Sequence, residues 1–108
     1  MKLSIVMPAF NEATTLREIV ARVLAVDLPG IEKELLIVDD GSTDGTREVL
    51  RKIAAEHRDR ITYVEHEKNQ GKGGAVSTGV ALARGQVTVI QDADLEYHPR
   101  DLPRLMAP

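Results

Sequence analysis

The sequence predicts one α/β domain with an open, mainly parallel sheet and helices on both faces. Short, nearly continuous apolar runs of strand length alternate with longer segments whose apolar residues recur at helical spacing. Polar clusters rich in acids or glycine come after these runs, as expected where a chain leaves a sheet. At 108 residues the chain is long enough for one domain with a small core.

The first predicted strand covers residues 3–7, an apolar run closed by Pro8 and typical of a strand buried on both faces. Asn11 is the expected N-cap of the helix that follows, and Pro29 with Gly30 is expected to end it. The apolar stripe of this helix consists of Leu16, Ile19, Val20, Val23 and Leu24.

A second strand is predicted over residues 34–39 and a third over residues 61–64. Between them, Ser42 is expected to cap a helix, because its hydroxyl can accept a hydrogen bond from the first turn. The apolar stripe of that helix consists of Val49, Leu50, Ile53 and Ala54.

A glycine-rich loop over residues 69–74 precedes a predicted helix of small residues, in which Gly79 permits close packing. Residues 87–90 form the fourth predicted strand, which we expect to be buried. Pro99 is expected to open a last short helix that reaches Met106. One side of the small-residue helix is expected to carry Val76, Val80 and Ala83.

The composition excludes several classes of site. A formal net charge of −3 gives no basic face, so we expect no nucleic-acid partner. The absence of cysteine excludes disulfides and thiolate metal sites. No apolar run approaches the roughly 20 residues that span a bilayer. We therefore expect a soluble chain in the cytoplasm.

The predicted topology brings three polar clusters to one edge of the sheet. Right-handed crossovers place the carboxyl ends of parallel strands on the same edge, and ligands of open α/β sheets bind there. Residues 8–12, 39–42 and 92–94 all follow strand ends. Their convergence predicts a binding site at this edge.

Asp92 and Asp94 follow the fourth strand two residues apart, so both carboxylates face the same way if the extended geometry persists. Carboxylate oxygens are hard ligands that suit Mg²⁺ or Mn²⁺. A divalent metal site is one interpretation of this pair. The other is two solvated acids in a strand-to-loop turn.

Acids also follow the first two strands. Glu12 would accept hydrogen bonds from a base or ribose beside the apolar wall of Phe10, or else complement a helix dipole. Asp39 and Asp40 are adjacent on a strand, so their side chains face opposite ways. We expect one to brace the turn and the other to face the crevice, where Asp40 would accept from a nucleobase N–H. In the alternative, both brace the turn.

The loop over residues 69–74 fails both the Walker pattern and the dinucleotide fingerprint. What remains is a backbone-exposing turn that presents Lys72 at a helix N-terminus, either to a nucleotide, to the acid-rich crevice or to solvent. His57, His66 and His98 lack metal-ligand spacing, which favours surface or packing roles.

Four motifs taken together resemble family 2 glycosyltransferases of the GT-A fold. The closest resemblance is to the polyprenyl-phosphate (dolichyl-phosphate-type) mannosyl- and glucosyltransferases, and it covers residues 2–105. Each motif is weak alone, but all four in this order and spacing are highly specific. They are Pro8-Ala9-Phe10-Asn11-Glu12, Val38-Asp39-Asp40-Gly41-Ser42, Asn69-Gln70-Gly71-Lys72-Gly73-Gly74-Ala75 and Gln91-Asp92-Ala93-Asp94.

The resemblance implies transfer of a hexose from a GDP- or UDP-linked donor to an acceptor such as polyprenyl phosphate. It assigns base recognition to Asp40, and it gives the metal chiefly to Asp94. The residues that it implicates are Pro8, Phe10, Glu12, Asp40, Lys72, Asp92 and Ala93 for the nucleotide sugar, and Asp92, Asp94 and Glu96 for Mg²⁺ or Mn²⁺.

The chain departs from the family's pattern at two positions. Ser77 stands where many similar proteins carry arginine, and His98 stands where an acid is common. The family's catalytic domain also continues further, so the resemblance implies that residues 1–108 are the nucleotide-sugar-binding N-terminal part of a GT-A domain. Parts outside this chain would place it at the inner face of the membrane. An uncovered apolar edge would favour self-association.

Three rival functions remain open from the residues. One is a non-catalytic module that binds a nucleotide sugar or a metal. A phosphoacceptor receiver domain would place its acidic pair after the first strand, whereas here the pair follows the second. A nucleotidyltransferase would present a glycine-rich basic loop after the first strand, where this chain has residues 9–12.

Overall fold

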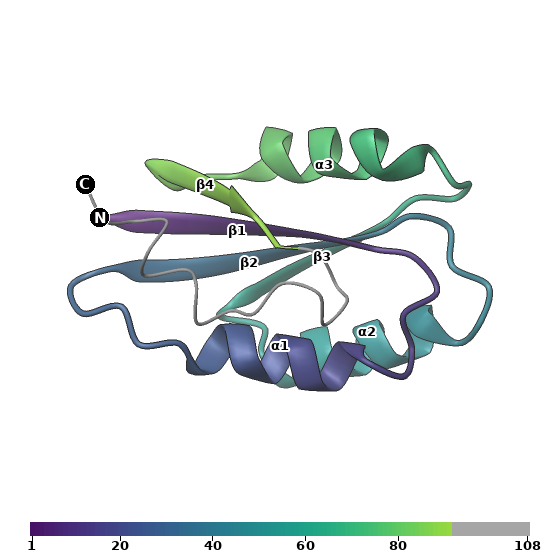
Figure 1. Cartoon of the computed structure of the whole chain (residues 1–108), viewed down its shortest axis with the longest axis horizontal. Helices are drawn as coiled ribbons and strands as arrows, with labels where there is room; N and C mark the ends of the chain where they lie inside the picture. The colour runs from purple at the N-terminus through teal and green to yellow at the C-terminus, as the bar shows by residue number, and fades with distance from the viewer. Residues whose placement is uncertain (92–108) are drawn as a thin grey trace.

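The computed structural model describes residues 1–91, which form a parallel sheet with helices on both faces. Its strands lie in the order β3-β2-β1-β4, and every neighbouring pair is parallel. Helices α1 and α2 cover one face and α3 covers the other (Figure 1). The predicted fold class is confirmed. In chain order the elements are β1 (Lys2–Ala9), α1 (Leu16–Ala25), β2 (Glu32–Asp39), α2 (Thr46–Glu56), β3 (Ile61–Glu65), α3 (Gly71–Leu82) and β4 (Val87–Ile90).

The main core lies between the sheet and the α1/α2 layer. Alternate residues of β1 and β2 point into it, because successive side chains of a strand face opposite ways. The predicted stripe of α1 supplies Leu16, Ile19 and Val23, all fully buried. The other members of this cluster are Leu3, Ile5, Met7, Ala9, Val20, Leu28, Leu35, Ile37, Leu50, Ile53 and Ile61.

Helix α3 packs closely on the other face and buries different residues from those expected. Ala75 and Gly79 are buried, whereas Val80 is about half exposed, so the expected stripe is wrong. A Cβ built on Gly79 would lie 2.3 Å from Cγ1 of Val6. The predicted close packing at Gly79 is confirmed, and it explains why only small residues fit this side of α3.

Strand β4 has the predicted bounds, but the prediction that it is buried is wrong. It pairs only with β1 among the described strands, and therefore forms an edge of the sheet. Val87 and Ile90 are both exposed. The helix predicted from Pro99 lies outside the described residues. In residues 1–91 no helix is long and apolar enough to cross a membrane.

Pro8 does not close β1, which continues to Ala9 and pairs Pro8 with Val38 of β2. The carbonyl of Val6 accepts a hydrogen bond from Gln91 N, so residues 6 and 8 direct their backbone polar groups toward β4. The paired register of β4 ends opposite Val6. The missing N–H of Pro8 therefore costs the sheet no hydrogen bond.

Candidate functional site

The loops at the carboxyl ends of β1 and β2 hold one another. Asn11 donates its backbone N–H to Ser42 Oγ at 3.0 Å, and its Oδ1 accepts from Thr43 N at 2.8 Å. Glu12 N donates to Thr46 Oγ1 at 2.9 Å. The predicted convergence of these two clusters is confirmed.

This interlocking explains why both predicted helix caps are wrong. Asn11 has a φ of 52° and lies in the loop, while α1 begins at Leu16. Ser42 uses its hydroxyl for the β1 loop, and Gly45 is the N-cap of α2. Both polar side chains join two loops instead of capping the helix that follows.

The loop after β3 reaches the same edge. Asn69 Nδ2 donates to the Asp40 carbonyl at 3.1 Å, and Gln70 N donates to Asp40 Oδ1 at 2.8 Å. A Cβ on Gly41, whose φ is +80°, would lie 2.6 Å from Asn69 N. Glycine is required at position 41 because the two loops touch through their backbones.

Asp39 braces the turn after β2, as one of the adjacent acids was expected to do. Its Oδ2 accepts from Ser42 N at 3.2 Å and from Arg47 Nε at 2.7 Å. The hydrogen bond with Asp39 raises the pKa of the Arg47 guanidinium. Oδ1 of Asp39 is buried and has no hydrogen-bond partner in the described part of the chain.

Asp40 lies on the opposite face, toward α3, and is buried. Its Oδ1 lies 2.9 Å from Nδ1 of His66, whose Nε2 lies 2.8 Å from Thr78 Oγ1. Of the surface and packing roles expected for His66, the surface role is wrong, because the side chain is buried. Its contact with Asp40 was not predicted. The β2–β3 register pairs Asp39 with Glu65, and Asp40 and His66, which follow these two residues, are therefore neighbours.

The other residues expected at the site surround this edge. Phe10 is exposed at 43%, an unusual position for the chain's one phenylalanine, and Pro8 is buried in β1. Glu12 is half-buried in the β1–α1 loop, and Lys72 is exposed in the first turn of α3.

The acids expected to hold a metal, Asp92, Asp94 and Glu96, lie outside the described residues, as does Ala93. Gln91 is buried, and its N–H bonds to Val6 O at 2.9 Å. This bond keeps the chain beside β1 up to the residue before Asp92. Residues 1–91 contain no group of three His, Asp or Glu side chains that could hold a metal ion.

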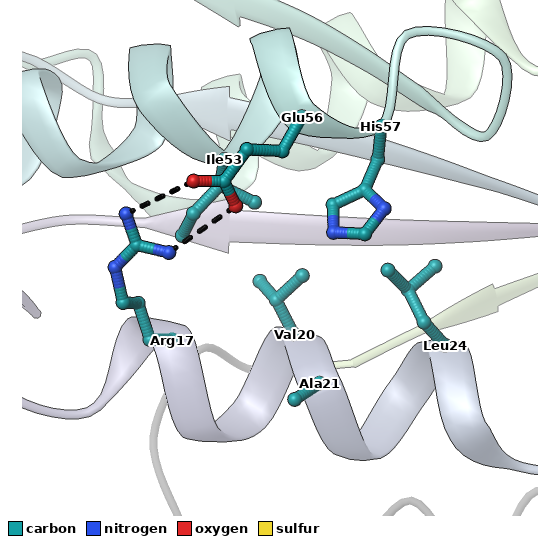
Figure 2. Close-up of a pocket in the computed structure, with 7 residues that line it drawn as sticks. All are labelled: Arg17, Val20, Ala21, Leu24, Ile53, Glu56 and His57. Atoms are coloured by element: carbon teal, nitrogen blue, oxygen red, sulfur yellow. Dashed lines mark hydrogen bonds and ion pairs between the residues drawn. The ribbon is translucent and has the colours of Figure 1, made fainter.

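A separate cavity of about 100 Å³ lies between α1 and α2, away from the polar edge. Val20, Leu24 and Ile53 give it an apolar wall, and an ion pair of 3.3 Å joins Arg17 to Glu56 at its rim (Figure 2). None of the residues expected to bind a ligand lines this cavity.

The chain matches the family described as Glycosyl transferase family 2 over residues 4–108. It is 36% identical over 104 residues to the undecaprenyl-phosphate 4-deoxy-4-formamido-L-arabinose transferase of Edwardsiella ictaluri, which corresponds to 95% of this chain and 32% of that protein. The chain thus spans about a third of the length of this relative.

Two solved structures have the same fold. The mannosyltransferase PcManGT of Pyrobaculum calidifontis, in complex with GDP-Man and Mn²⁺, aligns at a TM-score of 0.80 with 35% identity, over 92% of this chain and 29% of that one. The glucosyl-3-phosphoglycerate synthase of Mycobacterium tuberculosis, in complex with Mn²⁺, UDP and glucosyl-3-phosphoglycerate, aligns at 0.72 with 30% identity, over 94% and 37%. The expected GT-A-type sheet is confirmed, and the chain belongs to glycosyl transferase family 2.

Proposed function

We propose that residues 1–108 are the nucleotide-sugar-binding part of a glycosyltransferase that moves a hexose from a GDP- or UDP-linked donor to polyprenyl phosphate. The observation that carries the proposal is the interlocked polar edge, where three loops meet around Asp40. The similar transferases are crystallised with GDP-Man or with UDP, which supports a nucleoside diphosphate as the ligand of this edge.

The strand order supports a crevice between the carboxyl ends of β1 and β4. The chain passes from β1 to β2 and β3 on one side, and then returns through α3 to β4 on the other side of β1. Ligands of open α/β sheets bind where the strand order reverses in this way. The crevice so defined is flanked by the loop of Phe10 and Glu12 after β1.

We assign the base to Asp40 and the apolar wall of the nucleoside pocket to Pro8 and Phe10. A carboxylate accepts hydrogen bonds only, so it selects a base that presents an N–H. Guanine and uracil both present one on the ring. Glu12 would accept from the ribose, and Lys72, at the N-terminus of α3, would complement the anionic diphosphate.

A divalent metal fits the residues assigned to it. Asp92, Asp94 and Glu96 offer the hard oxygen ligands that Mg²⁺ and Mn²⁺ prefer, and Ala93 would lie beside the diphosphate. When bound, the ion would act as a Lewis acid on the negative charge that develops on the β-phosphate. The chain's own contribution is the Gln91–Val6 hydrogen bond, which holds the residue before Asp92 beside β1.

The proposed acceptor simplifies the chemistry. The anomeric carbon would lose its bond to the β-phosphate oxygen and gain one to an oxygen of the acceptor. A lipid phosphate is already anionic, so it needs little general-base help, whereas a hydroxyl acceptor would need a base. The relative from Edwardsiella ictaluri is named for an undecaprenyl-phosphate substrate, which supports this acceptor and a place beside the membrane.

The test is calorimetric titration of the purified chain with GDP and with UDP, first with Mn²⁺ and then with EDTA. We expect one nucleotide to bind, to lose affinity in EDTA, and to lose its metal dependence in Asp94→Asn. Asp59→Asn removes the same charge at an exposed position before β3 and is the matched control. Equal affinity with and without Mn²⁺ in the parent chain would contradict the metal assignment.

A transfer assay separates the enzyme from the binding-module alternative. Radiolabelled GDP-mannose and UDP-glucose would be incubated with polyprenyl phosphate and the chain, and the lipid fraction counted. Label in the lipid fraction supports the transferase. Metal-dependent nucleotide binding without transfer identifies the chain as a donor-binding part, which the proposal also allows.

A further inference from the structure

The parallel register of β2 and β3 brings Asp40 and His66 together. Asp39 pairs with Glu65 at the end of the ladder. Asp40 and His66 directly follow the two strands, and His66 contacts Thr78 of α3. Both side chains are buried, with 4% of the Asp40 side chain and 7% of the His66 side chain exposed. Asp40 and His66 are therefore shielded from solvent beneath the loops at the carboxyl ends of the strands.

The hydrogen bonds of the Asp40 carboxylate from the described residues all end on one oxygen. Gln70 N–H donates to Oδ1 at 2.8 Å, and His66 Nδ1 lies 2.9 Å from the same atom. Since a carboxylate oxygen accepts, Nδ1 of His66 must carry the hydrogen of this bond. Two donors on Oδ1 fix the rotation of the carboxylate and leave Oδ2 for another donor.

The imidazole is itself held from its other side. Its Nε2 lies 2.8 Å from Thr78 Oγ1 on α3, and the Thr78 hydroxyl is also within 3.1 Å of the Gly74 carbonyl. The ring thus spans the gap between the β2 edge and α3. The Nδ1–H of this buried ring holds the Asp40 carboxylate, while the Nε2 contact joins the ring to α3.

We propose that His66 is a positioning residue for base recognition: it holds the Asp40 carboxylate so that Oδ2 meets the ring N–H of the bound base. This inference rests on the proposed function, in which Asp40 reads the base. A fixed carboxylate accepts from uracil or guanine and repels cytosine, whose ring nitrogen at the same position is itself an acceptor. A site built around one hydrogen bond rejects the base that lacks the donor.

Two substitutions separate the two ends of the ring. His66→Asn keeps a donor at the position of Nδ1 and loses the contact with Thr78. His66→Gln can reach Thr78 and loses the contact with Asp40. Thr78→Val is the control, because it removes the Nε2 partner at nearly constant shape. A purely structural role predicts equal behaviour of the Asn and Gln variants.

The first readout is the ratio of the affinity for the preferred nucleotide, GDP or UDP, to that for CDP, measured by calorimetry with Mn²⁺. We expect His66→Gln to lower this ratio at least about tenfold. We expect His66→Asn and Thr78→Val to stay within about twofold of the parent. An equal loss in the Asn and Gln variants, or no loss in either, would overturn the proposal.

The second readout needs no nucleotide. Because Gln70 N–H is held by Asp40 Oδ1, a released carboxylate exposes this amide to hydrogen exchange. We expect its protection to fall in His66→Gln and to persist in His66→Asn, while protection of β1 amides is unchanged. Equal Gln70 protection in both variants would overturn the role of His66. Failure of the parent chain to bind any nucleotide would instead overturn the proposed function, and the exchange result would still decide whether His66 fixes Asp40.

Discussion

The two faces of the sheet use the same strands for different tasks. The face toward α1 and α2 carries the large aliphatic cluster, with long side chains on both the sheet and the helices. The face toward α3 has small residues at its centre, where Gly79 meets Val6, and buried polar groups at its two ends. One face supplies most of the apolar burial, and the other brings backbone and polar side chains into close contact.

Asp39 and Asp40 show the same division at adjacent positions. Asp39 faces α2, where Arg47 and the backbone of the turn satisfy Oδ2. Asp40 faces α3, where its partners in residues 1–91 are His66 and a backbone N–H, both on Oδ1. The hydrogen bond from Arg47 to Asp39 helps to hold the turn after β2. The second acid keeps an oxygen for a ligand, in the function proposed above.

The largest effect is expected from shortening a side chain in the α1/α2 layer. Leu50 of α2 is fully buried, so Leu50→Ala should lower the free energy of unfolding by about 2–5 kcal/mol through lost burial and the cavity left behind. Leu82→Ala makes the same change at an exposed position of α3 and should cost about 0.5 kcal/mol or less. Urea denaturation of both variants measures the difference, and equal costs would remove the distinction between the two faces.

Next in size is the effect of filling the close contact under α3. Gly79→Ala should cost about 1–3 kcal/mol, because the new methyl group would overlap Val6 Cγ1. Val6→Ala should recover part of this loss, so that the double variant is less destabilised than the two single changes predict. Gly73→Ala has open space around it and should lose no stability. Additive effects of Gly79→Ala and Val6→Ala would contradict a direct contact.

The sequence predicted the strands better than the residues that join them. Unbroken apolar runs identify strands such as β2, because a strand buried on both faces has no other composition. Helix caps depend on which partner a polar side chain selects. Asn11 and Ser42 instead join their two loops by a hydrogen bond. These residues are 31 positions apart, so no local sequence pattern predicts the contact.

Burial of side chains was likewise predictable only where the apolar pattern of a single helix or strand determines it. The stripe of α1 was correct because the layer has room for large side chains. On α3 the close approach of the helix to β1 selected Ala75 and Gly79, and this distance is a tertiary property. β4 was predicted to be buried from its apolar run, but its exposure depends on the absence of a second neighbouring strand in residues 1–91.

A smaller effect is expected at the other end of the α3 face. Ser4 is buried, donates to Glu34 Oε2 at 2.5 Å and accepts from Gly85 N at 2.7 Å. Ser4→Ala would leave the Gly85 N–H without this partner and should cost about 1–2 kcal/mol. The exposed Ser77→Ala should change the unfolding free energy by about 0.5 kcal/mol or less. Denaturant titration compares the two, and an equal, small effect would mean that water replaces Ser4.

The smallest effect concerns an acid on the α2 face and depends on pH. Hydrogen bonds from Arg51 outweigh partial burial and, with one from Tyr63, lower the pKa of Glu65 from 4.5 to about 2. Because the pKa is lower in the folded chain, Glu65 stabilises it fully above pH 4.5 and progressively less as the pH falls toward 2. Glu65→Gln should therefore lower the thermal midpoint at pH 7 by no more than about 2–4 °C, since the Arg51 partner is exposed to water.

The same comparison at low pH tests the cause. The difference between Glu65→Gln and the parent chain should shrink steadily as the pH is lowered from 4.5 toward 2, because the parent's carboxylate is then protonated as well. Glu67→Gln removes the same charge two residues later at an exposed position and should leave the midpoint unchanged at both ends of this range. A Glu65→Gln difference that persists undiminished at pH 2 would show that packing of the side chain, rather than its charge, holds β3 to α2. The arginines of α2 would then matter only for Asp39, and the contrast between the two faces would rest on that one buried pair.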